Sequence, residues 1–100
     1  MRSEMVEEAR DEFLAAIDWY NSARIGLGAE FEAEVEDAIA TMEENPELYT
    51  ESEDGIRRCL VSRFPYVLMY SIESDYILIL AVMHTSRRPG YWRNRGQSRP

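Results

Sequence analysis

Arginines and aromatic side chains gather in the second half of this chain and are its main candidates for a functional site. A guanidinium group stays charged at physiological pH and binds phosphate or carboxylate through paired hydrogen bonds. The arginines of this cluster are Arg57, Arg58, Arg63, Arg87, Arg88, Arg93 and Arg95, and the other side chains among them are Tyr66, Tyr70, His84, Tyr91 and Trp92. The cluster therefore suits an anionic partner, which can be either a nucleic acid or an acidic protein surface.

Charge is divided between the two halves of the chain. Residues 1–56 carry 3 arginines and 17 acidic residues, a net charge of −14, whereas residues 57–100 carry 8 arginines and 2 acidic residues, a net charge of +6. Such an asymmetry favours two separate partner surfaces, of which the basic one suits a polyanion. The alternative is that these charges are ordinary solvated faces, and this is the simplest interpretation of the glutamates that alternate with apolar residues in the first half.

The first three arginines of this cluster lie in a strand-like run, where side chains alternate between the two faces of the strand. Arg57 and Arg63 fall on one face, and Arg58 falls on the other. We expect Arg57 and Arg63 to bind a partner, with pairing to acidic helices as the alternative. Arg58 is more typical of a structural pair, although it remains in the candidate binding set.

The other polar and aromatic candidates have structural explanations beside the functional ones. Tyr66 and Tyr70 point the same way on a predicted strand, which is typical of half-buried core residues. His84 closes a strand, and we expect a hydrogen-bonded structural histidine, with general acid or base work as the alternative. Tyr91 and Trp92 could stack on bases or fill a pocket of a partner, because each joins a polar edge to a large apolar body.

Several kinds of site lack their sequence motifs. There is no Gly-rich phosphate loop, HExxH motif or paired Cys or His spacing, so we expect neither a cofactor nor a metal ion. His84 has no serine or cysteine nearby in a nucleophile motif. Cys59 is the single cysteine and is expected to be a buried thiol, which fits a reducing cytoplasm. No apolar run approaches 18 residues and the first residues are not signal-like, so a cytoplasmic location is expected.

Apolar periodicity predicts two helices, followed by strands. Spacings of three and four indicate helices over 5–21 and 27–44, with Gly26 and Gly28 allowing the turn between them. Asn45-Pro46 ends the second helix.

Strand-like runs cover residues 56–63, 66–72 and 76–84, the last two joined by a short polar break. The predicted class is α+β, with an antiparallel two-helix hairpin on one face of an antiparallel sheet of three strands. The last strand is apolar toward both faces, so we expect it to be central. Residues 90–100 are expected to form a flexible basic tail.

Landmarks along the chain resemble the RelE/ParE family of toxins from type II toxin–antitoxin systems, and the ParE-like branch in particular. They are Asp18-Trp19-Tyr20, Gly26-Leu27-Gly28, Glu44-Asn45-Pro46, Ile56-Arg57-Arg58, Phe64-Pro65-Tyr66 and His84 followed by Arg87-Arg88. The resemblance covers roughly residues 5–93 and implies a single toxin domain over 1–100 that a cognate antitoxin holds inactive. Family members usually begin with a strand, and only residues 1–5 precede the first helix, so that strand is expected to be short or missing.

The resemblance implies one of two targets. ParE-like members inhibit DNA gyrase, and this branch favours binding without covalent chemistry, through Arg57, Arg58, Arg63, Tyr66, Arg87, Arg88, Trp92 and Arg93. RelE-like members instead cut messenger RNA in the ribosome, for which the weak catalytic candidates are Arg63, His84, Arg87 and Tyr91. The chain has no lysine and no glutamate on its first predicted strand after the helices, so no complete nuclease set carries over. A third possibility is an inactive member that only binds its antitoxin.

Overall fold

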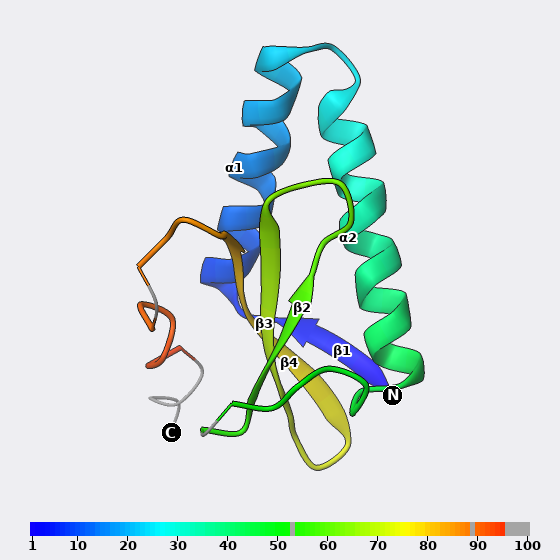
Figure 1. Ribbon diagram of the computed structural model, residues 1–100, viewed down its shortest axis with the longest axis vertical. Coiled ribbons are helices and arrows are strands. Elements are labelled where there is room, and N and C mark those ends of the chain that lie inside the picture. Colours follow the sequence, from blue (N-terminus) through cyan, green and yellow to red (C-terminus); the bar gives the residue numbers. More distant parts are fainter. Residues whose placement is uncertain (53, 89, 96–100) are drawn as a thin grey trace.

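The structure is a computed structural model that describes residues 1–52, 54–88 and 90–95. Its elements are β1 (Arg2–Met5), α1 (Glu7–Ala23), α2 (Leu27–Glu44), β2 (Ile56–Leu60), β3 (Tyr66–Ile72) and β4 (Tyr76–His84). The two helices form a hairpin that packs on a four-stranded sheet (Figure 1). This arrangement confirms the α+β class and the helical hairpin that the apolar periodicity predicts. Neither helix in the described ranges is long and apolar enough to cross a membrane.

The turn between the helices depends on two glycines. Gly26 adopts a φ of +90°, a left-handed conformation that residues with a Cβ rarely adopt. Gly28 lies where the start of α2 packs against α1, and its N–H donates to Asn21 Oδ1 at 2.7 Å. A Cβ at Gly28 would lie 2.5 Å from both the Ile17 carbonyl oxygen and Asn21 Cγ, so only glycine allows this close approach. Below the turn the hairpin buries Ala9, Ala16 and Tyr20 of α1 and Phe31, Val35 and Met42 of α2.

The sheet has the order β1-β4-β3-β2, with β4 between β1 and β3. The pairs β2–β3 and β3–β4 are antiparallel, whereas β1 runs parallel to β4. The predicted sheet of three antiparallel strands is therefore corrected to a mixed sheet of four, in which the first strand is short but present. Its sequence, Arg2–Met5, is mostly polar and half-exposed at the sheet edge, so it carries little apolar signal.

The strand β2 is shorter than the predicted run of 56–63. It ends at Leu60, and the Val61 N–H donates to the Tyr66 carbonyl at 2.9 Å, which closes the connection to β3. Arg63 lies in this connection with a φ of +70°. The interpretation of Arg63 as a strand residue facing the same way as Arg57 is therefore wrong, because the chain turns before it.

The C-terminal residues 90–95 fold back onto the domain. Trp92 is only 5% exposed and belongs to the buried core, and Arg93 forms an ion pair with Asp54. The expected flexible tail is replaced over these residues by packed turns, while residues 96–100 lie outside the described part of the chain. The segment has few apolar residues, so its composition predicts a tail. It is held instead by the buried Trp92 and by hydrogen bonds to α1.

Candidate protein-interaction site

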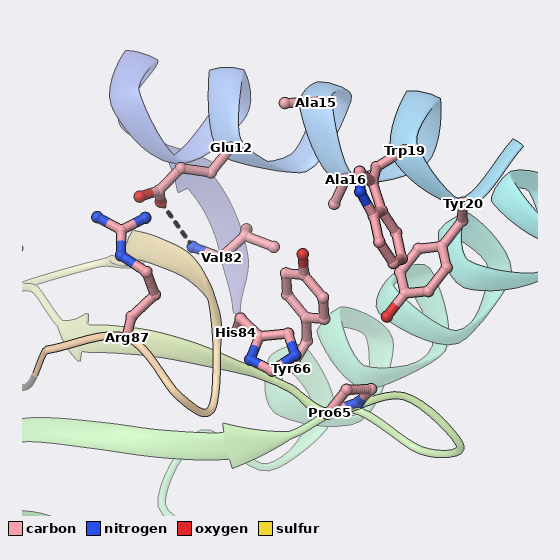
Figure 2. A pocket seen from close by; sticks show the side chains of 10 residues that line it. All are labelled: Glu12, Ala15, Ala16, Trp19, Tyr20, Pro65, Tyr66, Val82, His84 and Arg87. Carbon is pink, nitrogen blue, oxygen red and sulfur yellow. Dashed lines mark hydrogen bonds between the residues drawn. The ribbon is translucent and has the colours of Figure 1, made fainter. Parts of the chain in front are cut away.

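An open groove of about 670 Å³ runs between α1 and the adjoining ends of β3 and β4 (Figure 2). The helix α1 lines it with Glu12, Ala15, Ala16, Trp19 and Tyr20. The sheet and its connections line it with Pro65, Tyr66, Val82, His84 and Arg87. Its walls are mainly small apolar side chains and aromatic rings, and its charged groups are Glu12 and Arg87. Such a surface suits a partner that brings both apolar and charged groups.

Trp19 forms an exposed wall of the groove. Residues 12, 15, 16 and 19 are three or four apart and share one flank of α1, which turns this tryptophan beside the groove. Its indole meets the Tyr20 ring edge-on at 5.1 Å, yet the residue remains 64% exposed. Tyr20 is itself buried against Phe31 and Phe64, with ring centroids 5.1 and 4.9 Å away. The exposed indole therefore packs against a buried aromatic cluster.

Tyr66 and His84 form the sheet side of the groove. The Tyr66 ring lies 4.9 Å from Phe31 and 5.4 Å from the His84 imidazole, edge-on to both. Burial raises the pKa values of Tyr66 and Tyr20, so both phenols stay neutral at physiological pH. The backbone N–H of Ser86 donates to His84 Nδ1 at 3.1 Å, and the Ser86 hydroxyl lies 2.8 Å from the same nitrogen. His84 is therefore hydrogen-bonded within its own turn.

Glu12 connects α1, β4 and the C-terminal segment. Its Oε1 accepts from the Val82 N–H at 3.1 Å and from Arg95 Nη1 at 2.9 Å, and the first of these bonds is visible in Figure 2. Its Oε2 accepts from the Tyr91 hydroxyl at 2.7 Å and from Arg95 Nη2 at 3.1 Å. The Glu12 and Arg95 side chains are each only 16% exposed. A two-pronged pair of this kind is both strong and directional.

Glu12 was not predicted as a site residue, because the helix glutamates alternate with apolar residues and are most simply a solvated face. The signal was present in the spacing: Glu12 lies three residues after Ala9 and four before Ala16, and both of these are buried. A charge inside an apolar stripe indicates a partnered side chain, since an unpaired buried charge is costly.

Arg87 marks the basic end of the groove. Its guanidinium lies 4.0 Å from the centroid of the Tyr91 ring, and that of Arg95 lies 4.8 Å from the same ring. Burial, together with the hydrogen bond to Glu12, raises the pKa of Tyr91 well above its usual range. Tyr91 is therefore a neutral hydrogen-bond donor and a platform for Arg87, and not a proton acceptor.

Three of the predicted binding arginines are engaged within the chain: Arg93 with Asp54, and Arg63 and Arg57 as follows. Arg63 forms ion pairs with Glu30 at 2.8 Å and Glu34 at 3.3 Å on α2, and these contacts raise the Arg63 pKa and lower the Glu30 pKa. Arg57 donates to the Tyr49 carbonyl at 2.7 Å and pairs with Glu51 at 3.0 Å. Both arrangements are structural pairings, but Arg57 pairs with the connection before β2 and not with a helix.

The remaining candidates are spread over the molecule. Arg58 is exposed on the edge strand β2, and Arg88 is exposed after β4. Tyr70 is fully buried and donates its hydroxyl to the Pro46 carbonyl at 2.6 Å. Trp92 and Arg93 line a separate hollow of about 400 Å³ together with Asp54, Ile56 and Asn94. Of the predicted site residues, only Tyr66, His84 and Arg87 line the groove, with Tyr91 beside Arg87.

The described residues contain no group of three or more His, Cys, Asp or Glu side chains placed to hold a metal ion. The lone cysteine, Cys59, is buried, and burial raises the pKa of its thiol. The groove offers an aromatic surface with one acidic and one basic side chain, which are properties of a binding surface.

Comparisons with known proteins agree with this class of small α+β protein. A chain from the "Chromosomal ParDE TA system from P. aeruginosa" has a similar structure, with a TM-score of 0.74 and 16% sequence identity, over 84% of this chain and 95% of that chain. At this identity the likeness shows the fold. The family model "ParE toxin of type II toxin-antitoxin system, parDE" matches residues 4–89. The chain therefore belongs to the ParE toxin family, which confirms the resemblance found in the sequence. No curated protein matches the sequence significantly.

Proposed function

We propose that this ParE-type toxin stops growth in the cytoplasm by binding DNA gyrase, and that a cognate antitoxin neutralises it. Membership of the toxin family supports the antitoxin as a partner. The observation that carries the proposed mode of action is the groove, because it combines an exposed tryptophan with an arginine at one end. Tryptophan and arginine are enriched among the few residues that contribute most of the binding energy at protein–protein interfaces.

The proposed contact surface is narrower than the full set of candidate arginines. Arg87 lines the groove, Arg88 follows it in the chain and is exposed, and Arg58 is exposed on β2. Arg57 and Arg63 are paired within the chain, and Trp92 is buried, so these three contribute chiefly to the fold. We therefore place the gyrase contact on Arg87, Arg88 and the adjoining groove, with Arg58 as a further contact.

The ribonuclease alternative has less support from the same geometry. Cleavage of RNA needs a base, an acid and cations around one phosphate. Arg63 does not line the groove and is bound to two glutamates, and the Tyr91 hydroxyl is bound to Glu12. The net charge of −8 also opposes association with ribosomal RNA.

The test is to induce the chain in bacteria without its antitoxin and to follow incorporation of labelled thymidine and leucine during the first minutes. We expect thymidine incorporation to fall first and the cells to grow into filaments. A first fall in leucine incorporation, with cut messages, would support the ribonuclease. No fall in either would support an inactive member that only binds its antitoxin.

The variant His84→Phe separates binding from catalysis, because it keeps an aromatic ring in the groove wall and removes both ring nitrogens. If binding is the mode of action, this variant still arrests growth. Loss of arrest with an unchanged circular dichroism spectrum would assign proton transfer to His84 and refute the proposal. Arg10→Glu is the matched control, since Arg10 is exposed on α1 and does not line the groove.

A further inference from the structure

The strand β1 forms one edge of the sheet, and no other strand of the described residues pairs with its outer side. It runs along the base of the helical hairpin, from the end of α2 to the start of α1 (Figure 1). An edge strand offers its backbone groups to a strand of another chain. The side chains of β1 therefore decide which strand can pair with it.

Two residues of β1 direct their backbone groups outward. The N–H and C=O of a strand residue lie on the same side, and this side alternates from one residue to the next. The Val6 N–H donates to the Ile79 carbonyl of β4 at 3.0 Å, so the even-numbered residues of β1 face β4. Ser3 and Met5 therefore face the open edge. In the described ranges no loop or side chain bonds to the backbone of these two residues.

The side chains of β1 also alternate, and its charges lie on one face. The Ser3 hydroxyl donates to Glu43 Oε2 of α2 at 2.5 Å, which places Ser3 on the helix side of the sheet. Arg2 and Glu4 are exposed on the other side and form an ion pair with each other. The Arg2 guanidinium lies 4.8 Å from the centroid of the Tyr76 ring on β4. The edge strand thus presents one positive and one negative charge, two residues apart.

This order of charges is complementary to itself. In an antiparallel pair of two β1 strands centred on Ser3, Arg2 of each copy lies directly opposite Glu4 of the other. Opposite charges at facing positions of an antiparallel pair stabilise it, and like charges destabilise it. A second copy of the chain therefore has the charge pattern that this edge requires.

The backbone favours the same register. Ser3 faces the open edge, so two Ser3 residues can exchange a pair of N–H to C=O hydrogen bonds. A pair centred on Arg2 or Glu4 would set like charges opposite each other, and the backbone groups of these residues are directed at β4. A pair centred on Met5 would set Glu4 against Val6, where the strand has already ended.

We propose that two copies of the chain pair through β1, with Ser3 at the twofold axis, and join their four-stranded sheets into one. Met1, which is 47% exposed, then lies opposite Met5 of the second copy and is covered in part. No residue that lines the groove lies on β1, so each copy keeps its groove and Arg87 accessible. The contact is short, and small interfaces are typical of weak complexes, so the dimer dissociates on dilution.

The test is sedimentation velocity of the purified full chain over a range of concentrations, with any tag placed at the C-terminus. We expect a monomer–dimer equilibrium. Arg2→Glu and Glu4→Arg should each weaken the dimer at least tenfold, because each variant sets like charges opposite each other at two positions. Arg10→Glu and Asp37→Arg make the same changes of charge at exposed positions of the helices and should change it less than twofold.

Mixing the two β1 variants separates pairing from loss of the fold. Arg2→Glu has two acidic residues on the strand and Glu4→Arg has two basic ones, so every charge in a mixed pair faces its opposite. We expect an equal mixture to form a dimer at least tenfold tighter than either variant forms alone. The double variant Arg2→Glu/Glu4→Arg should dimerise like the parent chain, because it only exchanges the two charges.

Three results would overturn the proposed pairing: a chain that stays monomeric at the highest concentration, a dimer that the two β1 variants leave unchanged, or a mixture that does not recover the dimer. A dimer that Trp19→Ala dissociates while the β1 variants do not would assign the contact to the groove. Growth arrest does not enter this test, so the pairing and the proposed contact with gyrase stand or fall separately.

Discussion

Replacing Glu12 by glutamine tests whether one side chain on α1 holds the C-terminal segment in place. The change keeps the size of the side chain but removes the charge that four donors share. A hydrogen bond to a charged group contributes about 1.5–3 kcal/mol, and breaking a fully buried ion pair costs about 3–5 kcal/mol. The Glu12–Arg95 pair is 16% exposed on each side, so it lies between an exposed and a fully buried pair.

We therefore expect Glu12→Gln to lower the free energy of unfolding by about 2–3 kcal/mol. For a domain of this size the corresponding fall in Tm is roughly 8–24 °C. The assay is urea and thermal unfolding followed by circular dichroism. Glu36→Gln is the matched control, since Glu36 is exposed on α2, and its effect should stay within about 0.5 kcal/mol.

A second readout reports on the segment itself. In a Trp19→Phe background, Trp92 is the only tryptophan, and its buried indole should emit at short wavelength. Adding Glu12→Gln should shift this emission to longer wavelength, because the segment loosens and admits water. Unfolding within about 0.5 kcal/mol of the parent, together with unchanged Trp92 emission, would refute the role given to Glu12.

Three further predictions follow from packing and burial. Gly28→Ala should destabilise the hairpin by about 1–3 kcal/mol in urea unfolding, because the new Cβ meets the Ile17 carbonyl oxygen; an unchanged midpoint would contradict the close approach. Trp92→Ala should cost about 3–5 kcal/mol, whereas Trp19→Ala should change stability by no more than about 0.5 kcal/mol, and similar costs for both would contradict their different burial. The free energy of unfolding should also fall as the pH rises above about 10. Burial raises the pKa of five tyrosines in the folded chain, that of Tyr49 to about 12, whereas the unfolded chain loses its phenol protons at ordinary pKa values. Urea midpoints that stay constant from about pH 9 to 11 would argue against this linkage. These tyrosines are Tyr20, Tyr49, Tyr66, Tyr70 and Tyr91.

The helices and the central strand were predictable because their apolar residues follow the period of the element. Phe31, Val35 and Met42 repeat at helical spacing and are all fully buried. The strand β1 was not predictable in the same way, since it is four residues long and its side chains are partly exposed at an edge. The pairing with β4 determines this strand, and the local sequence cannot predict that pairing.

The candidate site was only partly predictable, because it depends on contacts between distant parts of the chain. Tyr66, His84 and Arg87 were identified from residue type, and the groove brings them together. Trp19 had been noted only as a family landmark, and Glu12 only as one acidic residue among many. Their roles depend on the position of β4 and of Tyr91, which is 79 residues beyond Glu12.

Supercoiling of relaxed plasmid by purified gyrase is the most direct test of the proposed contact between this toxin and gyrase. With ATP present and the chain added in increasing amounts, we expect supercoiling to fall and linear, cut plasmid to accumulate, and Arg87→Glu to need at least tenfold more protein than Arg10→Glu for the same effect. Unchanged supercoiling and no cut plasmid at large molar excess of folded chain would contradict the proposed contact with gyrase.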